Sequence, residues 1–280
     1  MRTRAKLAAV SALSGALAFT ALAAPAAQAA DSGTPYTLDV SFSNVKIASA
    51  IKVGTTNEVS ATVSYTLTHG SDVDITADDF FTDAFLYRGS YDAPTNEVYD
   101  EDFSTCTATS STTATCTSSI DIHPADGDLA NADAGTWHAA AEATAFNGQD
   151  PSSSSIDYSK VGYKDQDALA TTLVQRYSKL TVNAGPEPVY KGKTITSTGK
   201  LSRANWEDGQ YHGYTGQPVK LQFRKAGSST YTTVKTVTSD SYGNVKATAT
   251  AASDGYWRFS FTGTSTTPAV SATGDYVDVK

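Results

Sequence analysis

The 280-residue chain has only two cysteines, one methionine and four histidines, and only 18% of its residues are charged. So few thiol and imidazole groups leave little material for a zinc or haem site. Basic residues are also scarce: the chain has 21 lysines and arginines but 29 acidic residues. We therefore predict no nucleic-acid partner, since that binding depends on basic contacts to phosphates.

Catalytic motifs are missing as well. The sequence has no Gly-x-Ser-x-Gly turn, and His69, His123, His138 and His212 lie in separate segments without a partner pattern. His138 follows Trp137 on an expected strand, so these two side chains should point to opposite faces. Acidic residues cluster, but paired carboxylates in a glycosidase need a cleft that a small β-domain seldom offers. We predict that the protein is not an enzyme.

The first 29 residues have the pattern of an export signal. Three basic residues precede an alanine-rich apolar run over residues 7–24, and Ala27 and Ala29 fit a cleavage site after Ala29. The alternative is a membrane anchor, but serine and glycine interrupt the run. We predict a signal peptide at residues 1–29 and a secreted, extracellular mature chain with no membrane span. No sorting tail follows Lys280, so we expect release into the medium.

Beyond residue 30, apolar and polar residues alternate. In residues 219–224 and 257–262, for example, every second residue is valine, leucine, phenylalanine or tryptophan. This period of two is typical of half-buried antiparallel strands, so we predict an all-β protein. The expected strands lie near residues 36–47, 58–68, 81–87, 103–109, 113–122, 136–146, 170–177, 180–183, 194–201, 219–224, 230–237, 244–251, 256–262 and 275–279.

A change in charge divides the mature chain. Residues 30–178 hold 22 acidic and 6 basic residues, whereas residues 179–280 hold 7 and 12. Gly185, Pro186 and Pro188 follow the point of change and favour a stiff turn. We predict two domains, 30–178 and 179–280, each an immunoglobulin-like antiparallel β-sandwich. A single large barrel is the competing architecture.

Both halves contain the same short pattern. Residues 133–137 (Asp-Ala-Gly-Thr-Trp) and 254–257 (Asp-Gly-Tyr-Trp) each place an aspartate and a glycine before a tryptophan that opens an expected strand. Turns of this type precede a core strand in immunoglobulin-like sandwiches. We interpret Trp137 and Trp257 as core residues rather than ligand contacts.

The second half also resembles a known group. Residues 180–184, 188–192, 216–224, 240–243 and 254–258 resemble the immunoglobulin-like modules of secreted actinobacterial proteins of unassigned function. The resemblance covers about a third of the chain and implies an extracellular β-sandwich of adhesive, spacing or accessory kind. It carries no catalytic residues.

The two cysteines flank a nearly symmetric segment. From Cys106 to Cys116 the sequence reads almost the same in both directions about Ser111. A hairpin folded at Ser111 places the cysteines opposite each other, within reach of a disulfide. A redox or metal pair is the alternative, but it needs closer spacing and nearby basic residues. We predict a structural disulfide, which suits an exported chain.

Acidic loops suggest a second function. Asp100, Glu101 and Asp102 form one run, and Asp126 and Asp128 begin another that extends to Asp133. Calcium prefers several oxygen ligands in irregular loops, although no EF-hand pattern is present. We predict no cofactor, and keep calcium binding by loops within residues 100–133 as the alternative to simple solvated loops. The acidic cluster at 72–83 is expected at the other end of the sandwich.

The clearest candidate contact surface lies in residues 205–214, an expected long loop that carries Trp206, Tyr211 and Tyr214. Exposed aromatic rings suit a sugar or a protein partner. The alternative is that these rings fold back and seal the end of the sandwich. We predict a secreted, non-catalytic protein for binding, adhesion or spacing at the cell envelope, with an extracellular polysaccharide or protein as partner. An extracellular calcium-binding protein is the second hypothesis.

Overall fold

The computed structural model describes residues 33–99 and 102–280. The expected signal peptide, Asp100 and Glu101 lie outside the described residues. The described chain is built of strands, with three single-turn 3-10 helices, η2 (Pro124–Asp126), η3 (Asn131–Asp133) and η4 (Tyr158–Lys160). In this part of the chain no helix has the length and apolar character to cross a membrane. The all-β prediction is confirmed.

The chain forms two compact units and passes between them five times. Unit 1 comprises residues up to 49, 60–121 and 137–172, and unit 2 comprises residues 50–59, 122–136 and 173–280. Two segments from the first half of the sequence therefore belong with the second unit. The expected division into domains 30–178 and 179–280 stays a prediction.

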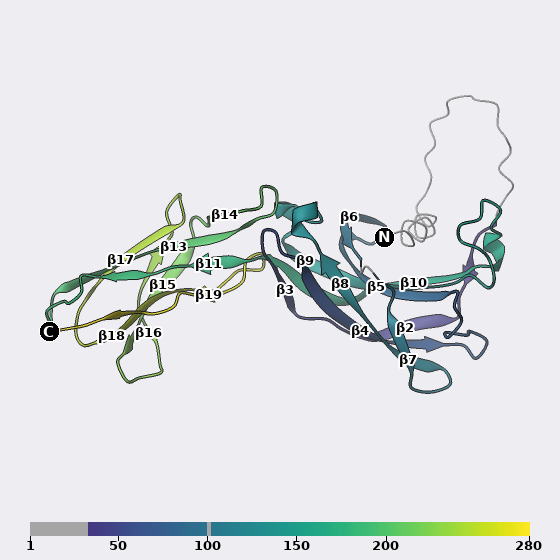
Figure 1. Cartoon of the computed structure of the whole chain (residues 1–280), viewed down its shortest axis with the longest axis horizontal. Coiled ribbons are helices and arrows are strands. Elements are labelled where there is room, and N and C mark those ends of the chain that lie inside the picture. Colours follow the sequence, from purple (N-terminus) through teal and green to yellow (C-terminus); the bar gives the residue numbers. More distant parts are fainter. Residues whose placement is uncertain (1–32, 100–101) are drawn as a thin grey trace, which may run out of the picture. The chain divides into compact units, whose positions relative to one another are not determined.

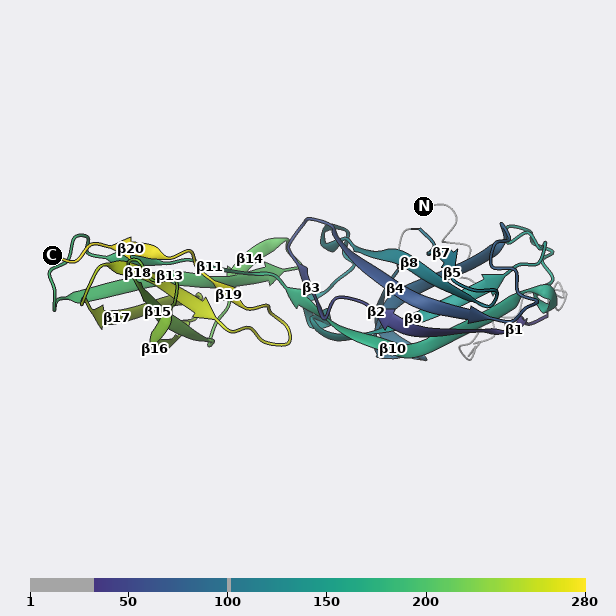
Figure 2. The same cartoon turned by 90° about the horizontal axis from the view of Figure 1, so that it is seen from below.

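Unit 1 contains a large sheet and a smaller one. The large sheet has the order β1 (Tyr36–Thr37), β10 (Gly162–Arg176), β9 (Gly135–Ala145), β5 (Phe80–Ser90) and β6 (Ala93–Val98). Strand β3 (Ala50–Val53) pairs with the last four residues of β10, and both of these segments belong to unit 2. The smaller sheet has the order β2 (Val40–Lys46), β4 (Val59–His69), β8 (Thr113–Ile122) and β7 (Thr105–Ala108). Strands β2 and β4 run antiparallel, side by side (Figure 2).

The inner faces of these two sheets pack together. The hydroxyl groups of Tyr65 in β4 and Thr82 in β5 are 3.0 Å apart, which joins the two layers. Around them, Leu67, Leu86 and Ile120 are fully buried. Each such side chain contributes about 1.5–3 kcal/mol through burial. Unit 1 is therefore a two-layer β-sandwich.

Unit 2 is a sandwich of the same kind. One layer contains β11 (Ser178–Leu180), β12 (Asn183–Gly185), β13 (Thr194–Asn205), β14 (Gln210–Gly213) and β17 (Asn244–Thr250), with β13 and β17 side by side (Figure 1). The other contains β15 (Pro218–Lys225), β16 (Thr232–Thr238), β18 (Gly255–Phe261), β19 (Val270–Ser271) and β20 (Asp275–Val277). Their shared core holds Leu180, Ile195, Leu201, Val219, Leu221, Val245, Trp257, Phe259 and Val277.

Most expected strands are present, with differences at the ends and edges. Strands β3, β6, β14 and β19 were not expected. The expected strand at 36–47 divides, because β1 joins the large sheet and β2 joins the smaller one. Strand β1 pairs in parallel with β10 within unit 1, and β3 pairs in parallel with the end of β10 within unit 2, so the sheets are not purely antiparallel. Alternation predicts strands, but it does not show which sheet each strand joins.

The repeated aspartate–glycine–tryptophan pattern opens a central strand in each case. Trp137 in β9 and Trp257 in β18 are 0% and 4% exposed, so their interpretation as core residues is confirmed. Gly135 has a φ of 134°, which side chains rarely adopt. A Cβ at Gly255 would collide with the carbonyl oxygen of Arg224. Both glycines are therefore required by the backbone.

The disulfide prediction is confirmed. Strands β7 and β8 form the expected hairpin, in which Cys106 pairs with Cys116 and Thr107 with Thr115. The cysteines form a disulfide, with their Cα atoms 4.0 Å apart. Because disulfides persist in oxidising compartments, this bond indicates an extracytoplasmic location.

Replacing both Cys106 and Cys116 by alanine should lower the free energy of unfolding by about 3 kcal/mol, because the bond closes a loop in the unfolded chain. Urea unfolding of the variant measures this loss. The wild type under reducing conditions is the control and should show a similar loss. An unchanged midpoint in both samples would contradict the stabilising role of the bond.

Candidate functional site

Residues 205–214 form a tight hairpin rather than the expected long loop. Strands β13 and β14 pair up to Asn205 and Gln210, which leaves only a four-residue turn. Trp206 in this turn is 4% exposed, and its indole nitrogen donates to the carbonyl oxygen of Val53 at 3.4 Å. The burial of Trp206 favours the alternative in which this ring folds back and seals the structure.

The two tyrosines of this segment are half-buried. The ammonium group of Lys179 lies 3.5 Å from the centre of the Tyr211 ring. The guanidinium group of Arg203 lies 4.0 Å from the centre of the Tyr214 ring, which packs on the core of unit 2. Cations within the molecule therefore cover one face of each ring. A ligand role for Trp206, Tyr211 and Tyr214 stays a prediction.

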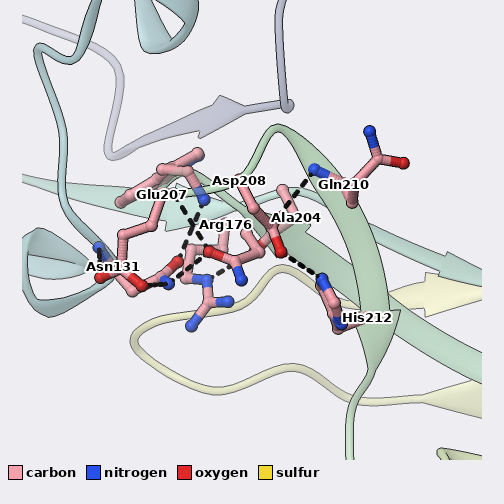
Figure 3. A network of polar contacts seen from close by, with 9 residues as sticks. Asn131, Arg176, Ala204, Glu207, Asp208, Gln210 and His212 are labelled. Carbon is pink, nitrogen blue, oxygen red and sulfur yellow. Dashed lines mark hydrogen bonds and ion pairs between the residues drawn. The ribbon is translucent and has the colours of Figure 1, made fainter.

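A polar network fastens the hairpin turn to other segments of unit 2 (Figure 3). The side-chain nitrogen of Asn131 donates to Asn205 Oδ1 at 2.5 Å and to Glu207 Oε2 at 2.6 Å. The buried Arg176 donates through Nε to the carbonyl oxygen of Ala204 at 2.6 Å. Burial and then the charge of Arg203 lower the pKa of Arg176 to about 10. These contacts are structural: they fix the hairpin turn in place and explain why it is not an open loop.

The expected calcium loops use their acidic groups locally. Asp128 accepts a hydrogen bond from the backbone of His123 at 2.6 Å, and Asp133 accepts one from the backbone of Ala130 at 2.8 Å. Within residues 33–99 and 102–280, no group of three or more histidine, cysteine or acidic side chains is placed to hold a metal ion. Asp100 and Glu101 lie outside these ranges, so calcium binding there is untested.

The outer face of the second layer of unit 2 presents a different arrangement. The guanidinium group of Arg224 lies 4.1 Å from the centre of the Tyr256 ring and 5.3 Å from that of Tyr231. Arg258 lies 3.7 Å from the centre of the Tyr231 ring, and Tyr276 meets Tyr256 edge to face at 5.1 Å. We call these five residues the tyrosine–arginine face. Neighbouring strands β15, β18 and β20 hold four of them, and Tyr231 precedes β16.

Local contacts fix both arginines of this face. Arg258 donates through Nε to Gln222 at 2.9 Å, and Arg224 donates through Nη1 to the carbonyl oxygen of Ser228 at 2.6 Å. Among the residues that the structure describes, neither arginine has a carboxylate partner. The face therefore combines flat rings with two positive charges that no acid of the described chain neutralises, which suits an anionic ligand.

The large sheet of unit 1 carries an outer face of opposite charge. Phe85 and Tyr87 of β5 are buried there beneath Tyr91 and Tyr99, and the Phe85 and Tyr99 rings stack at 4.6 Å. His138 stacks on Tyr87 at 5.3 Å, on the face opposite to the buried Trp137, as its position in the strand predicts.

Acidic groups surround these rings. Tyr163 donates to Glu142 at 2.9 Å, and Tyr91 donates to Asp165 at 2.7 Å. Burial raises the pKa of both tyrosines, and the nearby carboxylates raise it further. Burial also raises the pKa of Glu142. We call Phe85, Tyr87, Tyr91, Tyr99 and Tyr163, with Asp83, Glu97, Glu142, Asp165 and Asp167, the acidic aromatic face.

Sequence reasoning did not find either face. The alternation in residues 219–224 and 257–262 shows that Gln222, Arg224 and Arg258 point away from the core. It does not show that Tyr231 and Tyr276 join them, because that depends on the register of three strands.

No protein-family model matches the sequence, and no curated protein matches it. Among solved structures, the D0–D1 domain of intimin matches with 15% identity and a TM-score of 0.26, over 85% of this chain and 98% of that one. The adhesin InvE of Yersinia pseudotuberculosis matches with 13% identity and a TM-score of 0.25, over 85% and 60%. Dimeric latent PorU of Porphyromonas gingivalis matches with 11% identity and a TM-score of 0.26, over 92% of this chain and 21% of PorU. These values are too low to assign a family.

Replacing Trp206 by alanine should lower the free energy of unfolding by about 3–5 kcal/mol, because the change empties a buried site. Urea unfolding measures the loss. The control is Tyr242→Ala, which removes an aromatic ring that is 73% exposed in the same unit and should cost little. Equal, small losses in both variants would mean that Trp206 does not seal the structure.

Replacing Glu142 by glutamine should stabilise the protein at neutral pH. The raised pKa of Glu142 means that the fold disfavours the ionised form, so its contribution to stability is lost as the pH rises through the folded-state pKa. The variant should have a higher free energy of unfolding than wild type at about pH 7. The two proteins should be equally stable at about pH 3.5, where the wild-type carboxyl is protonated in both the folded and the unfolded state. Urea unfolding at the two pH values tests this, with the exposed Asp78→Asn as control. A loss of stability at neutral pH would contradict the stated effect of burial.

Proposed function

We propose that the protein is a secreted, non-catalytic binding protein of the extracellular or envelope space, and that the tyrosine–arginine face binds acidic polysaccharide. The observation that supports this proposal is the pair of arginines, Arg224 and Arg258, which lie over tyrosine rings without a carboxylate partner in the described chain. The disulfide between Cys106 and Cys116 supports the extracellular setting.

The geometry of this face suits a sugar that carries carboxylate groups. A guanidinium group donates two parallel hydrogen bonds to a carboxylate, and hydrogen bonds to Ser228 and Gln222 hold the two arginines in place before the ligand arrives. Tyr276 is 41% exposed beside Tyr256, and it offers a flat apolar surface to a sugar ring. The arginines thus recognise the charge, and the tyrosines recognise the ring.

Binding rather than catalysis follows from the chemistry of these groups. Arginine keeps its proton at neutral pH, and an ordinary tyrosine does so as well. The five residues of the face include no histidine or carboxylate, which are the commonest general acids and bases. We therefore favour binding over catalysis at this face.

The double variant Arg224→Gln with Arg258→Gln should bind polygalacturonate at least about tenfold more weakly than wild type, because each charge-assisted hydrogen bond contributes about 1.5–3 kcal/mol. Isothermal titration calorimetry of the mature protein measures the affinity. Neutral dextran is the ligand control and should not compete.

The matched control is Lys193→Gln with Lys246→Gln, which removes the same charge from exposed positions of unit 2 outside this face. This control should keep its affinity within about threefold of wild type, because distant exposed charges are screened by salt. Equal losses in both double variants would show that net charge alone attracts the polymer and would contradict the proposed site.

A further inference from the structure

The acidic aromatic face of unit 1 holds several carboxylates without positive partners. In the described residues, Glu97, Glu142, Asp165 and Asp167 form no ion pair with lysine, arginine or histidine. Hydrogen bonds from Tyr163 and Tyr91 satisfy part of Glu142 and Asp165, but a hydroxyl donor leaves the negative charge in place. These four carboxylates therefore give the face negative charge that no cation of the described residues neutralises.

The register of the sheet brings two acidic side chains of this face close together. Asp83 in β5 lies directly opposite Glu142 in β9. Glu142 is also removed from water by the tyrosines around it, which raises its pKa. A partner that brings positive charge to this face would stabilise the ionised form of Glu142.

The tyrosine–arginine face has the matching properties. It presents Arg224 and Arg258 among tyrosine rings, and their neighbour Lys220 adds a positive charge on the same side of β15. The acidic aromatic face presents carboxylates among flat rings. The two faces are complementary in charge and alike in their aromatic character, and they belong to different units of one chain.

We propose that the acidic aromatic face of one molecule binds the tyrosine–arginine face of a second copy of this chain. This inference rests on the proposed function, since it names a partner for the same tyrosine–arginine face. The two contacting surfaces are different, so each bound pair leaves one free face of each kind. Contacts of this heterologous type build chains or closed rings rather than only dimers.

Sedimentation velocity of the mature wild-type protein tests the proposal, at about 10 μM to about 1 mM protein in 20 mM and 500 mM salt. The weight-average mass should rise with protein concentration at low salt, and the association should weaken at least about tenfold at high salt, because salt screens charges across the contact. A monomer at every concentration in low salt would overturn the proposal.

Reversing the charge of one face at a time provides the decisive experiment. Glu97→Lys with Asp167→Lys reverses exposed charges of the acidic aromatic face, and Arg224→Glu with Arg258→Glu reverses the other face. Each variant alone should be monomeric. An equal mixture should associate again, because each variant keeps the intact face that the other lacks. Failure of the mixture to associate, with both variants folded by circular dichroism, would overturn the proposal.

Matched controls carry the same charge changes elsewhere. Asp72→Lys with Asp78→Lys in unit 1, and Lys193→Glu with Lys246→Glu in unit 2, alter exposed residues outside the two faces. Both controls should self-associate like wild type. Loss of association in the controls would mean that overall charge, rather than these two faces, drives it, and would contradict the assignment.

The polygalacturonate titration separates this inference from the proposed function. If the wild type binds the polymer through Arg224 and Arg258 but stays monomeric, the self-association proposal fails and the proposed function stands. If the wild type associates through both faces but does not bind the polymer, the polysaccharide proposal fails instead. If both hold, the polymer should dissociate the self-assembled protein, because the two ligands share one face.

Discussion

The structure depends on the packing of alternate side chains between two sheets in each unit. Trp137 and Trp257 lie on central strands, and each is fixed by a preceding glycine that the backbone requires. Because a sandwich of this kind uses every second residue for its core, the intervening residues are free to form outer faces. Such intervening residues supply most of the two faces that carry the functional proposals, and Tyr91, Tyr99 and Tyr231 join them from segments between strands.

Burial and charge divide the aromatic residues into two roles. Trp206, Trp137 and Trp257 are buried and serve the fold, whereas Tyr231, Tyr256 and Tyr276 lie on an outer face beside arginine. A tyrosine ring covers apolar area and also holds a guanidinium group flat. The rings are thus the common element of structure and recognition, and the charged groups beside them decide which ligands are attracted.

The sequence predicts much of this fold but little of its surface. Alternation places most strands, and the symmetric segment about Ser111 predicts the pairing of Cys106 with Cys116, because both depend on local spacing. Residues 82–87 are buried on both faces, so alternation does not show that Tyr91 and Tyr99 fold over Phe85. The expected loop at 205–214 is a hairpin, because its ends pair with each other and Asn131 holds its turn.

The central claim is that an outer sheet face of unit 2, and not the hairpin at Trp206, contacts the ligand. Hydrogen–deuterium exchange of the mature protein, with and without polygalacturonate, tests it most directly. The account predicts added protection in peptides from β15, β18 and β20 and none in residues 205–214. Protection confined to residues 205–214, with β15 and β18 unchanged, would contradict it.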